Sequence, residues 1–161
     1  MSTRPIQSRS GRGGTAPTTA TVVVGVDGSE SAQEALRFAV GEARLRGAGL
    51  RVVNAWYPAK TAITGFASDR DPTVFVDNAR AALETALDAI GDHADVAIEA
   101  VVCVGRPAQV LVEEARGADL LVVGARGHGG FAGLRPGSVG HRCSRHSSCP
   151  TVIVHQPNRT P

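Results

Sequence analysis

Five short runs rich in valine, leucine and isoleucine alternate with longer segments along the 161 residues of this chain. Unbroken runs of this kind, bounded by glycine, proline or polar residues, are typical of strands that are buried on both faces of a parallel sheet. Strands that alternate with helices predict an α/β domain whose sheet is covered by helices on both sides. The runs are 21–26, 50–56, 96–104, 119–123 and 151–155.

The segments between these runs carry apolar residues at helical spacing. Ser29 or Ser31 can cap the first helix, Ser31 with Glu34 fits a capping box, and Gly47 ends it. Pro107 suits the first position of the third helix. We therefore predict a single-domain fold of the Rossmann-like or flavodoxin-like kind, with an open, mostly parallel five-stranded sheet. The expected helices span about 32–43, 76–90, 107–115 and 138–146.

The fourth apolar run ends abruptly at a stretch crowded with glycine. Glycine loses more backbone entropy on folding than any other residue and adds no side-chain packing, so this stretch needs another reason. The commonest reason is to bring backbone N–H groups close to a phosphate, and the alternative is a plain surface loop. The glycines are Gly124, Gly127, Gly129, Gly130, Gly133 and Gly137, and Ser138 follows the last of them.

The spacing Gly-x2-Gly-x9-Gly-Ser, from Gly124 to Ser138, resembles the ATP-binding signature of the universal stress protein family. The resemblance extends over residues 21–155 and implies the fold of that family, with strand order 3-2-1-4-5. Two other phosphate-binding loops do not fit. A Walker loop needs Gly-Lys-Ser/Thr, whereas the only lysine here is Lys60, and a dinucleotide fingerprint follows the first strand rather than the fourth.

Asp27 follows the first strand in the sequence Val-Asp-Gly-Ser, at the edge of the sheet where open parallel sheets bind ligands. A turn or cap role for Asp27 is the alternative. The resemblance implies that Asp27 lies beside the nucleotide and that Ala55 touches the adenine, although Ala55 could also be a core residue. The predicted nucleotide-binding residues are Gly25, Asp27, Ala55, Gly124, Arg126, Gly127, His128, Gly129, Gly130, Gly137, Ser138 and Val139.

In the predicted site, the phosphates rest on N–H groups of residues 126–130 and on those of residues 137–139 at the start of the last helix, where the dipole favours an anion. The Ser138 hydroxyl can add a hydrogen bond or reach a bound Mg²⁺. Arg126 and Arg135 are candidate counter-charges, and a solvated surface role is an equally good interpretation of Arg135. The expected cofactor is ATP, with or without Mg²⁺.

Three features depart from the family pattern. Pro136 removes an N–H donor before Gly137, and Gly140 replaces a small hydroxyl residue. The last helix, HRCSRHSS, has little apolar surface, with Cys143 and Ser144 in place of aliphatic residues. Binding of ADP or AMP, or weak binding of ATP, therefore remains an alternative.

Composition narrows the class of protein. A net charge of +2 with 20% charged residues does not point to nucleic acid or membranes, and no apolar run is as long as a membrane span. Three cysteines do not make a disulfide framework, so we expect a cytoplasmic protein with reduced thiols. No metal site is expected, because the spacing of the potential zinc ligands His141, Cys143, His146 and Cys149 fits no zinc template.

The expected organisation is a disordered N-terminal tail over 1–20, a nucleotide-binding domain over 21–155 and a C-terminal tail over 156–161, with a long loop at 57–71. The resemblance implies a regulatory protein of the stress response that binds ATP and forms a homodimer through its C-terminal strand. A dimeric member that binds no nucleotide and a weak ATPase are the alternatives. We do not expect a true enzyme, since there is no Walker lysine and His128 is the only histidine in the loop.

Overall fold

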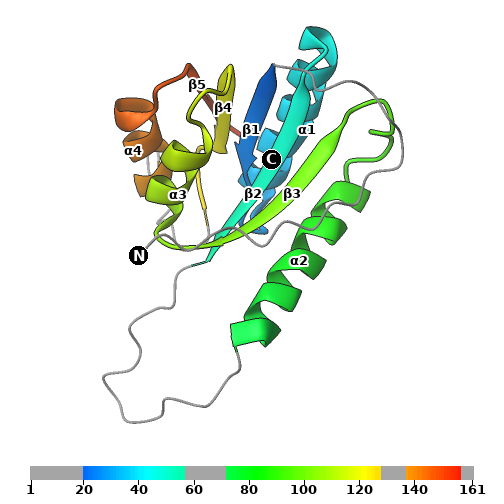
Figure 1. Cartoon of the computed structure of the whole chain (residues 1–161), viewed down its shortest axis with the longest axis vertical. Coiled ribbons are helices and arrows are strands. Elements are labelled where there is room, and N and C mark those ends of the chain that lie inside the picture. Colours follow the sequence, from blue (N-terminus) through cyan, green and yellow to red (C-terminus); the bar gives the residue numbers. More distant parts are fainter. Residues whose placement is uncertain (1–19, 57–71, 128–136, 157–161) are drawn as a thin grey trace, which may run out of the picture.

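The computed structural model of the chain describes residues 20–56, 72–127 and 137–156. These residues form a five-stranded sheet in the order β3-β2-β1-β4-β5, and every pairing between neighbouring strands is parallel. The predicted fold class and strand order are therefore confirmed (Figure 1). The elements are β1 (Thr21–Gly25), α1 (Glu30–Arg46), β2 (Gly49–Trp56), α2 (Pro72–Asp88), β3 (Ile98–Val104), α3 (Pro107–Glu114), β4 (Leu120–Gly124), α4 (Ser138–His146) and β5 (Thr151–Val154).

Some predictions lie outside the described residues. They are the tails at 1–19 and 157–161, the loop at 57–71, and the part of the glycine-rich stretch from 128 to 136, with His128, Gly129, Gly130 and Pro136. None of the helices in the described ranges is long and apolar enough to cross a lipid bilayer.

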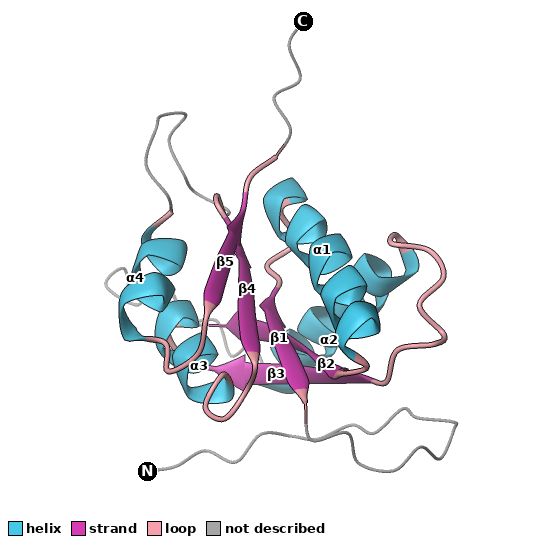
Figure 2. Cartoon of the chain, turned by 90° about the horizontal axis from the view of Figure 1, so that it is seen from above, coloured by secondary structure: helices cyan, strands magenta, loops and turns pink. Residues whose placement is uncertain are grey.

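Helices α1 and α2 cover one face of the sheet, and α3 and α4 cover the other (Figure 2). Side chains of β1 alternate between the two layers: Val22 and Val24 pack beneath α1, while Val23 packs towards α3. All three valines are fully buried. Burial on both faces is the reason why the strands appear as unbroken apolar runs in the sequence.

The start of α1 differs from the predicted capping box. Ser29 is the N-cap, and its hydroxyl accepts a hydrogen bond from the Ala32 N–H at 3.1 Å. Glu34 forms an ion pair with Arg37 one turn later instead of reaching back to Ser31. The side chain of Ser31 turns inwards, where it is 3% exposed. Its hydroxyl makes hydrogen bonds to residues far away in the sequence, so only one of the two serines acts as a cap.

Gly41 in the middle of α1 offers a clean test of helix propensity. An added Cβ would have no neighbour within 4 Å, and its φ is not in the left-handed region. We therefore expect Gly41→Ala to raise the free energy of unfolding by about 0.5–1 kcal/mol, because alanine loses less backbone entropy in a helix. Urea unfolding followed by circular dichroism measures this difference. A lower midpoint in the variant would contradict the open space at this position.

Candidate functional site

A cavity of about 610 Å³ opens at the carboxyl ends of the central strands. Strands β1 and β4 are neighbours there, although β1 continues into α1 and β4 follows α3. Ligands bind at such a switch point in open parallel sheets, and the volume lies within the range of small-molecule pockets. Nine predicted residues from separate segments of the chain line this cavity: Gly25, Asp27, Ala55, Gly124, Arg126, Gly127, Gly137, Ser138 and Val139.

One end of the cavity is apolar. Its walls include Val53 and Ala55 on β2 and Leu111 on α3. An added Cβ on Gly25 would lie 2.7 Å from Leu111 Cδ1, so the leucine packs directly on the glycine backbone. Leu111 was not among the predicted site residues, because helical periodicity in the sequence cannot distinguish a core residue from one that lines a cavity. This end suits a flat, uncharged group such as a base.

Asp27 stands between the strand end and the glycine-rich stretch. Its Oδ1 accepts a hydrogen bond from the Ser29 N–H at 3.0 Å. Its Oδ2 points towards Gly127, where an added Cβ would lie only 2.7 Å from that oxygen. The glycine thus leaves room for the carboxylate, which can accept hydrogen bonds from the hydroxyl groups of a ligand.

The opposite end of the cavity is formed by the start of α4. Gly137 is the N-cap, and the residues that follow have N–H groups without a partner inside the helix. Ser138, Val139 and Gly140 all line the cavity. The positive end of the helix dipole makes this end suitable for an anion.

Two of the predicted phosphate donors are engaged within the chain. The Arg126 N–H donates to Ser31 Oγ at 3.2 Å, and the Gly137 N–H donates to the Ala125 carbonyl at 2.7 Å. These hydrogen bonds hold the segment after β4 against both α1 and α4. In this arrangement Arg126 would contribute its exposed side chain rather than its N–H to an anion.

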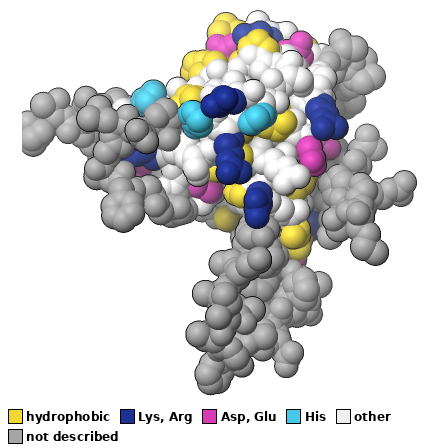
Figure 3. All heavy atoms as spheres, turned by 90° about the vertical axis from the view of Figure 1, so that its left-hand side faces the viewer, with side chains coloured by type: hydrophobic (Ala, Val, Ile, Leu, Met, Phe, Trp, Pro, Cys, Tyr) yellow, Lys and Arg dark blue, Asp and Glu magenta, His cyan; other side chains and the backbone are white. Residues whose placement is uncertain are grey.

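The helix α4 also adds positive charge beside the cavity. His141, Arg142, Arg145 and His146 are all exposed, and α4 contains no acidic residue. Figure 3 shows arginine and histidine side chains gathered on the face of the molecule that carries α3 and α4. A surface of this sign attracts anionic ligands over several ångströms.

The departures within α4 have simple packing explanations. Cys143 is fully buried, with 0% exposure, and packs in the core layer that contains α3. Burial raises the pKa of its thiol to about 11. Gly140 is not required sterically, because an added Cβ would make ordinary contacts of 3.7 Å with Val123 and Ile153. In the described part of the chain, no three His, Cys, Asp or Glu residues come together as metal ligands.

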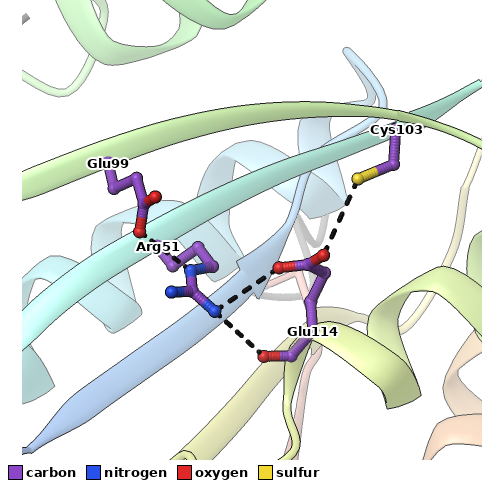
Figure 4. Close-up of polar contacts among 4 residues, drawn as sticks. All are labelled: Arg51, Glu99, Cys103 and Glu114. Carbon is purple, nitrogen blue, oxygen red and sulfur yellow. Dashed lines mark hydrogen bonds and ion pairs between the residues drawn. The ribbon is translucent and has the colours of Figure 1, made fainter. Parts of the chain in front are cut away.

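A polar cluster joins β2, β3 and the end of α3 (Figure 4). Arg51 on β2 pairs with Glu99 at 3.0 Å and with Glu114 at 3.4 Å, and it also donates to the Glu114 carbonyl. It therefore ties the end of α3, the helix that carries Leu111, to two strands. Cys103 is the register partner of Ala55 and directs its thiol at Glu114 Oε1, 3.9 Å away. The sequence offered no motif for this cluster.

The same geometry makes Cys103 a poor nucleophile. Burial, and then the negative charge of Glu114, raise the pKa of its thiol to about 11. Removing that charge with Glu114→Gln should lower the pKa while burial keeps it above the ordinary value. We expect alkylation of Cys103 by iodoacetamide at pH 8 to become about three to ten times faster, in proportion to the thiolate fraction.

Peptide mass spectrometry separates Cys103 from the other cysteines in this experiment. Glu113→Gln is the matched control, because Glu113 is the smallest of the causes that raise this pKa. Equal alkylation rates in the Glu114→Gln variant and the unchanged protein would show that the carboxylate does not act on the thiol.

Comparison with known proteins agrees with this geometry. The model of the universal stress protein family matches residues 19–155. A universal stress protein of Mycobacterium tuberculosis is 31% identical over 140 residues, which are 87% of this chain and 46% of that protein, so the chain spans about half the length of this relative.

Two solved structures are also similar. A universal stress protein in complex with cAMP is 34% identical, with a TM-score of 0.67 over 86% of this chain and 98% of that one. The universal stress protein of Archaeoglobus fulgidus in complex with dAMP is 26% identical, with a TM-score of 0.63 over 84% of this chain and 97% of that one. The family match covers the whole sheet and the segments around the cavity, and the chain belongs to the universal stress protein family.

Proposed function

We propose that the cavity binds an adenine nucleotide, ATP in the first instance, and that the protein acts in the stress response through interactions that depend on this nucleotide. The observation that carries the proposal is the meeting of nine predicted residues around one cavity at the switch point of the sheet. The relatives solved with cAMP and dAMP support an adenine nucleotide as the class of ligand.

The arrangement of the walls suggests how the nucleotide would lie. The base would rest in the apolar end against Ala55 and Leu111, and the ribose hydroxyls would face Asp27. The phosphates would lie at the start of α4, where the Ser138 hydroxyl could also reach a bound Mg²⁺. Gly127, Ser138 and Val139 are the described residues that we propose as backbone donors.

The first experiment is to measure the adenine nucleotide carried by the freshly purified protein. Calorimetric titration with ATP, ADP, AMP and cAMP, with and without Mg²⁺, then ranks the ligands. Bound nucleotide, or a saturable titration with any of these compounds, would support the proposal. Absence of both would favour a member of the family that works without nucleotide. Release of phosphate from Mg²⁺-ATP in the same samples would reveal hydrolysis.

We also propose that the protein forms a homodimer through β5. This strand lies at one edge of the sheet, and its four residues are all half-buried. An edge strand made mostly of apolar residues, as Val152, Ile153 and Val154 make this one, can pair with a second copy along its outer side. Light scattering during size-exclusion chromatography over a range of concentrations tests this, and a mass equal to one chain throughout would contradict it.

A further inference from the structure

Ser31 occupies an unusual place in the molecule. Among the residues that the structure describes, it is the only polar or charged one that is buried, with 3% exposure. A buried hydroxyl without partners destabilises a fold, so its hydrogen bonds indicate what it is there to hold. Ser31 is not the helix cap that the capping-box pattern allows, because Ser29 has that role.

The hydroxyl of Ser31 joins two separate parts of the chain. It accepts a hydrogen bond from the Arg126 N–H at 3.2 Å and donates a longer one to the Val154 carbonyl at 3.5 Å. The same carbonyl accepts the Ala125 N–H at 2.8 Å. Ser31 therefore bridges the segment that lines the nucleotide cavity and the last residue of the edge strand β5.

The backbone of β4 passes very close to Ser31. Gly124 ends β4 beside it, and an added Cβ on this glycine would lie 2.7 Å from Ser31 Oγ. On its other side, the segment 125–127 is tied to the start of α4 by the hydrogen bond from the Gly137 N–H to the Ala125 carbonyl. Two hydrogen bonds therefore link this segment to the Val154 carbonyl, one directly from the Ala125 N–H and one through the Ser31 hydroxyl, which also holds the Arg126 N–H.

We propose that Ser31 is a positioning residue that couples occupancy of the nucleotide cavity to the backbone of β5. This inference rests on the proposed function, since it requires a ligand in the cavity. Binding at residues 126 and 127 tightens the hydrogen bonds around Ser31 and protects β5 from opening. The edge strand then offers a different surface to a partner in the bound and free states, which is a coupling between two sites.

Hydrogen–deuterium exchange tests the coupling directly. The full chain is labelled with and without saturating ATP, and exchange is followed in peptides that cover 151–156 on β5 and 120–127 at the cavity. In the unchanged protein we expect ATP to slow exchange of both peptides by about fivefold or more, the size of a typical coupling. In Ser31→Ala, the cavity peptide should keep its response, while the response of the β5 peptide should fall to less than half, because only the direct hydrogen bond from the Ala125 N–H to the Val154 carbonyl remains.

Ser29→Ala is the matched control. The variant loses the hydrogen bond from the Ala32 N–H to the N-cap hydroxyl. In the unchanged protein the Ser29 hydroxyl donates to the Arg126 carbonyl at 3.5 Å and has no hydrogen bond to β5. We expect the β5 response to ATP to survive in this variant. Ser31→Cys, which has the same number of side-chain atoms with a slightly larger sulfur that is only a weak donor and acceptor, replaces Ser31→Ala if the alanine variant does not fold.

The outcomes separate this inference from the proposed function. If the unchanged protein binds ATP but the exchange rate of its β5 peptide is the same with and without ATP, the coupling is wrong and the proposed nucleotide site is not affected. Equal loss of the β5 response in Ser29→Ala and Ser31→Ala would show a general effect on α1 and would also overturn it. If the unchanged protein binds none of ATP, ADP, AMP and cAMP, both the proposed function and the coupling are wrong; if it binds one of the others but not ATP, that nucleotide replaces ATP in the exchange experiment.

Discussion

Replacing Gly124 by alanine is expected to lower the free energy of unfolding by about 3 kcal/mol, the upper range for overpacking a core. An added Cβ would lie 2.7 Å from Ser31 Oγ and 2.8 Å from the Ser31 carbonyl carbon and oxygen. Two of these three atoms belong to the backbone of α1, so a change of rotamer cannot relieve the contact. The φ of Gly124 is not in the left-handed region, and the loss would therefore come from crowding rather than backbone strain.

Urea unfolding measures this loss, with Gly41→Ala as the matched control in open space. The double variant Ser31→Ala/Gly124→Ala sharpens the test. Because the backbone atoms of residue 31 stay in place, removing the hydroxyl should restore only a small part of the lost stability. Surface substitutions usually change the free energy of unfolding by less than about 0.5 kcal/mol. If the single Gly124→Ala variant changes it by no more than this, α1 does not approach β4 this closely.

Gly127→Ala is expected to weaken the proposed nucleotide binding by about 10- to 100-fold while leaving the free energy of unfolding near that of the unchanged protein. Here the added Cβ would meet a side-chain oxygen, Asp27 Oδ2, at 2.7 Å, and Gly127 itself is exposed. The carboxylate can move aside without unfolding the sheet. It would then lose its hydrogen bonds to the ligand, which are worth about 1.5–3 kcal/mol for a charged acceptor.

Calorimetric titration with ATP and AMP measures this effect, and a double-mutant cycle with Asp27→Ala identifies its route. If Gly127→Ala acts by displacing Asp27, it should cost little further affinity once the carboxylate is gone. Gly41→Ala should bind as the unchanged protein does. Full affinity in Gly127→Ala, or an undiminished effect in the Asp27→Ala background, would show that the ligand does not depend on this contact.

Nine residues that were predicted from short local patterns line one cavity in the structure. A glycine-rich stretch after a buried strand and an aspartate at the end of another strand are both visible as short patterns. The residues that sequence analysis did not assign to the site, such as Leu111 and Val53, have apolar side chains that any core position would accept. Whether an apolar side chain lines a cavity or fills the core depends on what faces it.

The two serines at the start of α1 also show that local sequence does not reveal which partners a side chain has in the folded protein. Both have side chains that can cap a helix, and local sequence does not distinguish them. The structure makes Ser29 the cap because Ser31 faces the ends of β4 and β5, where Arg126 and Val154 offer partners. Those partners are separated from Ser31 by 95 and 123 residues.

Local periodicity and backbone freedom were enough to predict the alternation of strands and helices, their approximate limits and the glycine-rich segment. No local pattern predicted that Arg51 holds the end of α3, that the Arg126 N–H donates to Ser31, or that Gly124 and Gly127 are crowded by different neighbours. The reason is physical: hydrogen bonds and steric contacts act over a few ångströms in space, and folding brings together groups that no local pattern relates.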